Sequence, residues 1–225
     1  MADLAPSEPR APLTRLRILR AGVALADEVG IDRLSMRKLA RTLGVEAMSL
    51  YNHIEHKDDL LDGMVDLVMA EIEAPAPGAL WRDAMRRRAI SSRAAYARHP
   101  WAARLVHARP SAGPGRLGSF EATLACLHRA GFSHALTVRA LSTLDAFVHG
   151  FGAQRLHVAQ ADLPDDVAMA DALARWLPRE QYPHLSALVL EHVLVDGFDE
   201  DEAFAFGLEL VLDGLQRSLD ESAGR

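Results

Sequence analysis

The stretch LARTLGVEAMSLYNHIEHKDDLL, residues 39–61, places a group of polar side chains directly after a Leu-Gly-Val turn between two short helical patterns. Its hydrogen-bonding residues fall within nine positions and are Ser49, Tyr51, Asn52, His53 and Lys57. Hydroxyl, amide, imidazole and ammonium groups all suit contacts with phosphate oxygens or base edges. The pattern therefore predicts a helix-turn-helix whose second helix faces DNA.

The first helix of this motif is predicted from its end signals and its apolar positions. Ser35 is expected to be the N-cap of a helix that runs through Thr42. Its buried face is expected to consist of Leu34, Leu39, Ala40 and Leu43. Gly44 then provides a turn conformation that is costly for residues with a side chain.

The second helix of the motif is expected over residues 46–54, because Leu50 and Ile54 are spaced to face inward. A helix in the major groove needs short side chains and hydrogen-bond donors on its outer surface. The expected contacts with base edges come from Arg37, Ala47, Met48 and Tyr51. The expected contacts with phosphates come from Ser49, Asn52, His53 and Lys57.

The charge of the chain is divided unevenly along its length. The composition is that of a globular protein of one or two domains, with 225 residues, 49% hydrophobic, 25% charged and a formal net charge of −6. Residues 1–57 contain nine Lys and Arg against seven Asp and Glu, whereas the remainder contains sixteen against twenty-four. The basic residues therefore gather where the predicted DNA-binding motif lies.

Signals for secretion and for membrane insertion are missing from the sequence. No run of about 18 apolar residues occurs, and the first residues do not form a basic segment followed by an apolar one. We therefore expect a cytoplasmic protein with no membrane partner. The one cysteine, Cys126, lies in an apolar pattern and is expected to be a buried small hydrophobic residue.

The recognisable periodicity is helical throughout, so the expected fold class is all-α, with an N-terminal three-helix head and an all-helical C-terminal domain. Residues 1–12 are rich in proline and charge and are expected to form a disordered arm. The DNA-binding head is expected over residues 13–73, because two prolines and a glycine follow within residues 73–79. The effector-binding and dimerisation domain is expected over residues 80–221.

The remaining helices are predicted from spacing and breakers. A first helix from Thr14 to Gly30 has the expected apolar face Leu16, Leu19, Val23, Ala26 and Val29, and the last helix of the head is expected over residues 58–72. In the second domain, helical patterns occupy residues 80–98, 101–108, 117–130, 134–158, 166–176, 183–194 and 201–220. The acidic run 196–202 is expected to begin the last of these, because carboxylates are favoured at a helix N-terminus.

The motif resembles the DNA-binding head of the TetR family of bacterial repressors, and its tetracycline-repressor subgroup in particular. The matching residues are Leu34-Ser35-Met36-Arg37-Lys38-Leu39-Ala40, Leu43-Gly44-Val45, Leu50-Tyr51, His53, Lys57 and Leu60-Leu61. The resemblance covers residues 13–72 and extends into the second domain. It continues there through Trp81-Arg82-Asp83, Ala130-Gly131-Phe132-Ser133, Ala140-Leu141-Ser142, Phe206-Gly207-Leu208-Glu209-Leu210-Val211 and Gly214-Leu215.

The resemblance implies a homodimer whose two heads read successive major grooves of a palindromic operator in double-stranded DNA. It also implies that a small-molecule effector binds the second domain and releases the DNA, which would make the protein a ligand-responsive transcriptional repressor. The helices over residues 134–158 and 201–220 would form the dimer, although their apolar positions suit a plain core as well. The alternative is an effector-independent dimeric DNA-binding regulator.

The effector-binding residues implied by the resemblance are Arg88, Ser92, His107 and Thr123. In tetracycline-binding members of the family, other residue types contact the drug at the positions of Glu73, Arg88, Ser92 and Thr123. Only His107 retains the family's residue, which coordinates the magnesium ion of the drug. The resemblance therefore implies an effector other than tetracycline, and Arg88 suits an anionic or carbonyl-rich one.

Two aromatic residues are further candidates for the effector site. Phe147 and Phe151 share one helical face, where they would line a pocket or pack in a core. No catalytic residue is expected, because no phosphate loop, nucleophile elbow or pair of catalytic carboxylates is found. No cofactor or metal is expected either, since the ten histidines form no H-x-x-x-H pair or Cys/His cluster.

Overall fold

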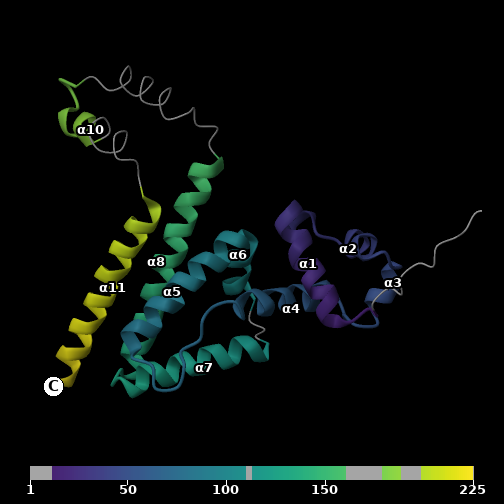
Figure 1. The fold of residues 1–225 in the computed structure, drawn as a ribbon, viewed down its shortest axis with the longest axis horizontal. Coiled ribbons are helices and arrows are strands. Elements are labelled where there is room, and N and C mark those ends of the chain that lie inside the picture. Colours follow the sequence, from purple (N-terminus) through teal and green to yellow (C-terminus); the bar gives the residue numbers. More distant parts are fainter. Residues whose placement is uncertain (1–11, 110–112, 161–178, 189–198, 225) are drawn as a thin grey trace, which may run out of the picture. The chain divides into compact units, whose positions relative to one another are not determined.

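The computed structural model describes residues 12–109, 113–160, 179–188 and 199–224, and all regular secondary structure within these ranges is helical (Figure 1). The all-α class expected from the sequence is thereby confirmed. The helices are α1 (Arg15–Val29), η1 (Ile31–Arg33), α2 (Met36–Leu43), α3 (Ala47–Leu50), α4 (Lys57–Met69), α5 (Trp81–Arg98), α6 (Pro100–Ala108), α7 (Pro114–Arg129), α8 (His134–Gln160), α10 (Pro183–Ala187) and α11 (Glu200–Ala223).

The chain forms two compact units, and each unit consists of two separate stretches of the sequence. Unit 1 comprises Met1–Ala79 and Ile90–Ala125, and unit 2 comprises Leu80–Ala89 and Cys126–Arg225. The residues of α5 are therefore shared between the two units. These units differ from the head and second domain expected from the sequence, and the expected domain limits stay a prediction.

Gly30 ends α1 and Ser35 caps α2 as the sequence predicts, and Thr14 is an N-cap of α1 that was not predicted. The hydroxyl of Thr14 accepts a hydrogen bond from the backbone N–H of Arg17 at 3.2 Å, and Gly30 ends α1 with a φ of 82°. The hydroxyl of Ser35 accepts from the N–H of Lys38 at 3.2 Å. Each cap satisfies a backbone N–H that has no partner inside its helix.

Two helices of unit 1 are shorter than predicted. The helix expected over residues 46–54 is regular only in α3, and the chain then continues through turns. The helix expected over 58–72 begins one residue earlier and ends at Met69, where the N–H of Ile72 bonds to the C=O of Met69 at 3.2 Å. Such bonds, three residues apart, tighten the last turn into a non-α geometry that apolar spacing does not reveal.

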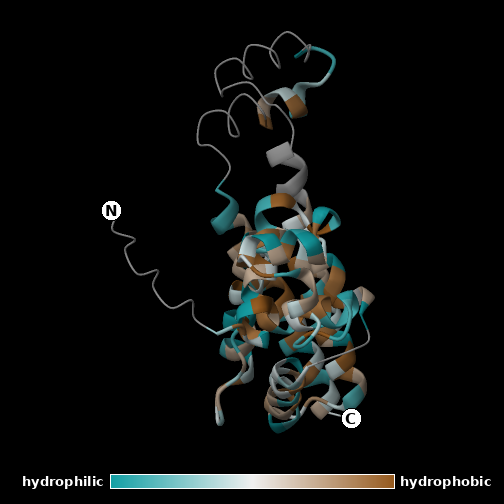
Figure 2. Ribbon diagram, turned by 90° about the vertical axis from the view of Figure 1, so that its right-hand side faces the viewer, coloured by the Kyte–Doolittle hydropathy of each residue, from teal (hydrophilic) through white to brown (hydrophobic). Residues whose placement is uncertain are grey.

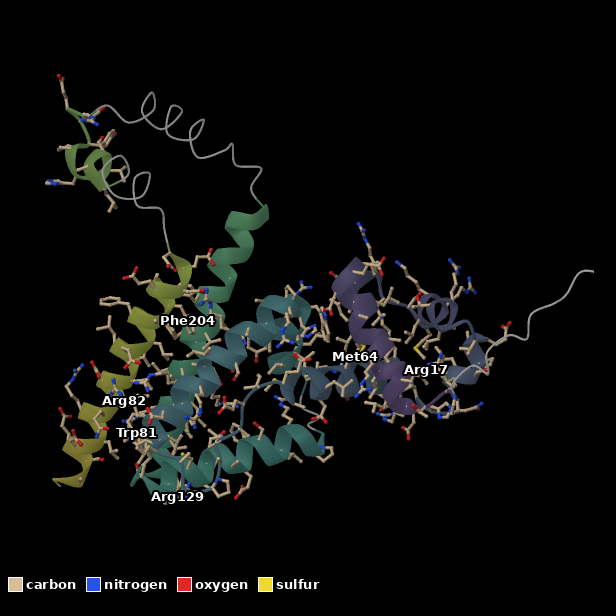
Figure 3. All side chains as sticks on the ribbon, in the orientation of Figure 1. Arg17, Met64, Trp81, Arg82, Arg129 and Phe204 are labelled. Atoms are coloured by element: carbon tan, nitrogen blue, oxygen red, sulfur yellow. The ribbon has the colours of Figure 1, made fainter. Side chains whose placement is uncertain are left out.

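The core of unit 1 consists of aliphatic and thioether side chains. Its largest fully buried members are Ile18, Leu34, Leu39, Leu50, Ile54, Leu60, Met64 and Val65. Met64 of α4 (Figure 3) lies against α1 at Gly22. Brown and teal segments alternate along the helices in Figure 2, as expected for helices that bury one face and solvate the other.

The buried face of α1 differs in part from the predicted one. Leu19 and Ala26 are buried as expected, but the Leu16 side chain is 44% exposed. Ile18 and Leu25, which the prediction omitted, are fully or almost fully buried. Because α1 packs against α2, α4 and α6, its buried stripe is wider than one helical row, and the apolar spacing alone could not locate its centre.

Aromatic side chains pack α8 against α11 within unit 2, where the two helices run side by side (Figure 1). Phe204 of α11 (Figure 3) is 2% exposed. Its ring centroid lies 5.1 Å from that of Phe147 and 5.2 Å from that of Phe151. Edge-to-face and tilted contacts at these separations stabilise aromatic clusters beyond the area that they bury.

Ion pairs attach the start of α5 to α11 in the same unit. Arg82 (Figure 3) donates to Glu209 at 2.8 Å and to Asp213 at 2.5 Å. The Nε of Arg86 donates to the second carboxylate oxygen of Glu209 at 2.6 Å. Hydrogen bonds from Arg86 and then from Arg82 lower the pKa of Glu209 to about 2.

Several further expectations can be compared with the described residues. α7 begins at Pro114 rather than at residue 117, because proline fits the first position of a helix. The carboxylate of Asp199 caps α11, which confirms the acidic helix start, and Cys126 is buried. The expected helix over 166–176 and part of that over 183–194 lie outside the described residues. Among the helices that are described, none combines the length and hydrophobicity needed to cross a membrane.

Candidate DNA-binding site

The turn between α2 and α3 is fixed by backbone hydrogen bonds. Gly44 adopts a left-handed conformation with a φ of 68°, which residues with a side chain rarely adopt. Its N–H donates to the C=O of Arg41 at 3.1 Å, and the N–H of Val45 donates to the C=O of Ala40 at 3.0 Å. This pairing ends α2 and redirects the chain into α3, so the sequence Leu-Gly-Val determines the angle at which α3 begins.

The segment 47–54 has buried side chains on one side and exposed side chains on the other. Leu50 is 0% exposed and Ile54 is 1% exposed, so both face the core as predicted. Met48 is 74% exposed and Tyr51 is 44% exposed. Met48 and Tyr51 are three positions apart, so they share the exposed side of this segment.

The other predicted DNA contacts lie around this segment. Asn52 and His53 are exposed, and Ala47 and Ser49 are half-buried. Arg37 is exposed on α2, and Lys57 is exposed as the first residue of α4. All eight predicted residues therefore belong to α2, α3, the connection after α3, or the start of α4, within one compact unit.

Two residues that the sequence reasoning missed hold the connection between α3 and α4. The guanidinium of Arg15 forms two hydrogen bonds with Asp59, at 2.8 and 2.5 Å, and a third with the C=O of His53 at 3.1 Å. Asp59 also accepts from the N–H of Glu55 at 2.9 Å. Arg15 and Asp59 are 44 positions apart, so no local pattern in the sequence could have joined them.

The connection is closed by the N-cap of α4. The Nδ1 of His56 accepts from the backbone N–H of Asp59 at 2.9 Å. A histidine cap of this kind has no strong sequence signal, because the usual capping residues are Ser, Thr, Asp and Asn. Hydrogen bonds therefore hold the backbone on both sides of Lys57, at Glu55 and at Asp59.

The predicted effector-binding residues fall in both units. Within unit 1, Ser92 is 8% exposed, and Thr123 is fully buried with its hydroxyl donating to the C=O of Ser119 at 2.8 Å. His107 lies in α6, and its side chain is outside what the structure describes. Within unit 2, Arg88 is half-buried on α5.

Phe147 and Phe151 lie in unit 2 and contact Phe204 as described above, so core packing accounts for at least part of their environment. Their own ring centroids are 6.0 Å apart. A role in effector binding stays a prediction for both residues. In the part of the chain that the structure describes, no group of three or more His, Cys, Asp or Glu side chains is arranged to hold a metal ion.

The segment that follows His107 is attached to α4 within unit 1. The side chain of Arg109 forms an ion pair with Asp62, and its Nη2 donates to both the carboxylate and the C=O of Asp58 at 3.0 Å. The backbone N–H of Arg116, near the start of α7, donates to Asp66 at 2.9 Å. Asp58, Asp62 and Asp66 are spaced by four and therefore form one stripe along α4.

Comparisons with known proteins agree with this arrangement. Residues 18–64 match the family described as bacterial regulatory proteins, tetR family, and residues 74–219 match the tetracyclin repressor-like C-terminal domain. The chain is 33% identical to the HTH-type transcriptional repressor DrrR1 of Streptomyces coeruleorubidus over 92% of this chain and 79% of that protein. It is 35% identical to the class A tetracycline repressor from transposon 1721 of Escherichia coli, over 89% of each chain.

Solved structures show the same fold. The structure of apo ActR from Streptomyces coelicolor superimposes with a TM-score of 0.74 and 30% identity, over 94% of this chain and 99% of ActR. The match at residues 18–64 covers the helix-turn-helix, and the match at residues 74–219 covers the helices that follow it. The chain thus belongs to the TetR family and is a DNA-binding transcriptional regulator with an N-terminal helix-turn-helix.

Proposed function

We propose that this protein is a transcriptional repressor that binds a near-palindromic operator as a homodimer and is released by a small-molecule effector. The observation that carries the proposal is the exposed surface of the segment 47–54. The opposite side of this segment packs into the core through the buried side chains of Leu50 and Ile54. Such a surface has the shape and the donors needed to enter a major groove. An effector-independent regulator with the same head is the second candidate.

The roles of the DNA-binding residues follow from their chemistry and exposure. Arg37, Ala47, Met48 and Tyr51 read base edges, with Met48 against a thymine methyl group and Arg37 paired with a guanine. Ser49, Asn52, His53 and Lys57 bind phosphates. The phosphate contacts set the position of the head on the duplex, and the base contacts supply its specificity.

The homodimer places two heads on the two half-sites of the operator. Exposed apolar residues on α11 support this assembly, because Phe206 is 68% exposed and Leu210 is 57% exposed, one helical turn apart. Val138 on α8 is 66% exposed. Burial of these side chains against a second copy would remove them from water, which is the main driving force for such association.

The effector contacts are proposed to be Arg88, Ser92, His107, Thr123, Phe147 and Phe151. Structures of ActR in complex with actinorhodin, and of a TetR variant from Acinetobacter baumannii in complex with minocycline, support the idea that relatives of this chain take small molecules. The half-buried cation of Arg88 favours an anionic or carbonyl-rich effector here.

A route from the effector to the DNA-binding head is available within unit 1. His107 is two residues from Arg109, which is bound to Asp58 and Asp62 of α4. Lys57, a proposed phosphate contact, is the first residue of that same helix. An effector that displaces Arg109 would therefore shift α4 and its lysine, provided that it binds the displaced state more tightly than the DNA-binding state.

The proposal is tested by titrating fluorescently labelled DNA from the region upstream of the protein's own gene. The expected result is tight, salt-sensitive binding of two subunits, released by one compound of a panel that includes magnesium-tetracycline, minocycline and actinorhodin. Tight binding that no compound releases would favour the effector-independent regulator. Binding that does not depend on the DNA sequence would contradict both candidates.

A further inference from the structure

The connection between α3 and α4 needs an external support to hold its shape. Residues 51–56 contain no regular helix, yet they include Asn52 and His53, which are proposed to bind phosphates. A loop whose backbone is free would lose conformational entropy on binding DNA, and this loss would weaken the complex. The loop therefore benefits from contacts that fix its backbone before DNA arrives.

The first turn of α1 supplies such contacts, since it lies beside this connection (Figure 1). The guanidinium of Arg15 donates hydrogen bonds to both carboxylate oxygens of Asp59, in the bidentate geometry that makes Arg–carboxylate pairs strong. The same guanidinium donates to the C=O of His53 at 3.1 Å. One side chain from outside the helix-turn-helix thus binds both the backbone of the loop and the first turn of α4.

Asp59 completes the support from the side of α4. One of its carboxylate oxygens accepts from the N–H of Glu55 at 2.9 Å, and its backbone N–H donates to His56 at 2.9 Å. Its side chain is 19% exposed. The hydrogen bond from Arg15 lowers the pKa of Asp59 to about 2, so the carboxylate is charged at neutral pH.

A carboxylate near the proposed phosphate contacts is unexpected if only charge matters. It repels phosphate, so its removal should strengthen DNA binding. We propose that Arg15 and Asp59 are positioning residues for DNA binding, which act by holding the loop 51–56 and the start of α4 in the shape that the DNA backbone requires. This inference rests on the proposed DNA-binding function and adds two residues to it.

The test compares two substitutions, each of which removes one negative charge from this region. Asp59→Asn removes the carboxylate that holds the loop. Glu55→Gln removes an exposed carboxylate from the loop itself and leaves its backbone N–H in place as the donor to Asp59. Operator affinity is measured by fluorescence anisotropy over a range of salt concentrations, at a temperature where circular dichroism and thermal melting show each variant to be folded.

Only Asp59→Asn is expected to lose operator affinity. Asp59→Asn should weaken operator binding by roughly tenfold or more, because charge-assisted hydrogen bonds that order the loop are lost. Glu55→Gln should bind as well as the wild type or better. An Asp59→Asn variant that is folded and binds as tightly as Glu55→Gln would overturn the inference.

A double-mutant cycle separates positioning from direct contact between Arg15 and phosphate. If Arg15 acts through Asp59, Arg15→Gln combined with Asp59→Asn should be no weaker than the poorer single variant. Arg15→Lys should recover part of the affinity, because it keeps the charge and one hydrogen bond. Losses that add, together with a fall of about 0.9 in the salt slope for Arg15→Gln alone, would show a direct phosphate contact instead. A wild-type protein that binds no duplex would overturn the proposed function, and this inference with it.

Discussion

Met48 and Leu50 stand two positions apart in α3 and have opposite environments. Leu50 is completely buried, whereas Met48 is 74% exposed, which follows from the turn of about 100° per residue in a helix. The buried leucine contributes about 1.5–3 kcal/mol to the packing of α3 on the head, and the exposed methionine contributes little to the free protein. The role proposed for Met48 is therefore a contact with a base edge, outside the chain.

Residue-level roles in DNA binding are tested by comparing Lys57→Ala with Arg37→Ala. Loss of the Lys57 phosphate contact should weaken binding to all duplexes alike and reduce the salt slope by about 0.9. Loss of Arg37 should cost about 1–3 kcal/mol only when its cognate base pair is present. Affinities for operator duplexes with single base-pair changes measure both effects, and a uniform loss in both variants would contradict the base-reading role of Arg37.

The ion pairs of Glu209 predict a stability that depends on pH. Because its folded pKa is lowered to about 2 from an ordinary 4.5, its contribution is present above about pH 4.5 and is lost as the pH falls toward 2. The side chain is 41% exposed, so solvent screening keeps the effect small. Urea unfolding at pH 6 and pH 3 should show a smaller acid-induced loss in Glu209→Gln than in the wild type.

The control for this comparison is Glu221→Gln, which removes an exposed carboxylate from the same helix. It should leave the acid-induced loss of stability as it is in the wild type. An identical loss in Glu209→Gln and in the wild type would show that the pairs with Arg82 and Arg86 contribute nothing measurable to folding.

At the scale of elements, the approach of α8 to α11 depends on a missing side chain. A Cβ atom at Gly207 would lie 2.7 Å from Cε2 of Phe147. Gly207→Ala should therefore destabilise the protein by about 1–3 kcal/mol, because the aromatic cluster must shift to admit the methyl group. Thermal unfolding measures the change.

Gly214 on the same helix provides the matched control. A Cβ there would meet nothing closer than Arg217 Nη2 at 3.9 Å. Gly214→Ala should stabilise the protein by up to about 1 kcal/mol, since alanine favours a helix more than glycine does. Equal effects of the two substitutions would contradict the packing explanation for Gly207.

The attachment of α4 to the segment after α6 is tested by Asp62→Asn. This substitution removes one of the two carboxylates that pair with Arg109 and leaves the proposed effector contacts unchanged. The variant should bind the effector with nearly the affinity of the wild type, whereas release of DNA should require about tenfold more effector, because coupling between sites is a separate free energy. Calorimetry of effector binding and anisotropy of labelled operator separate the two quantities.

Asp32→Asn is the control for the coupling experiment. Asp32 is also in unit 1, and its pair with Arg104 is long, at 3.6 Å, with both side chains mostly exposed. Such a pair contributes little, so the control should respond to effector as the wild type does. If Asp62→Asn does so too, the stripe of carboxylates on α4 does not carry the signal.

At the scale of the whole molecule, the proposed operator binding requires two copies of the chain. Leu210→Glu places a charge on the exposed apolar face of α11 and should yield monomers in sedimentation experiments. The operator affinity should fall by at least about a hundredfold, because a single head reaches only one half-site. Leu80→Glu makes the same change at a residue that is 73% exposed and lies immediately before α5, and it should leave a dimer.

The sequence by itself determined the helix-turn-helix and most of the helices. The signals were local: Ser35 as a cap, Gly44 as the left-handed turn, and Leu50 and Ile54 as inward anchors. Each depends on a few neighbouring residues, so short-range stereochemistry is enough to read it. The family resemblance of the head rested in part on Ser35, Gly44 and Leu50.

Only the tertiary structure decided which faces are buried and which distant residues meet. The exposed Leu16 and buried Ile18 of α1 reflect contacts with three other helices, which spacing within one helix does not encode. Arg15 with Asp59, Arg109 with Asp62 and Arg86 with Glu209 join residues from 44 to 123 positions apart. Charges of opposite sign are common along the chain, and only the packing of the helices selects which of them pair.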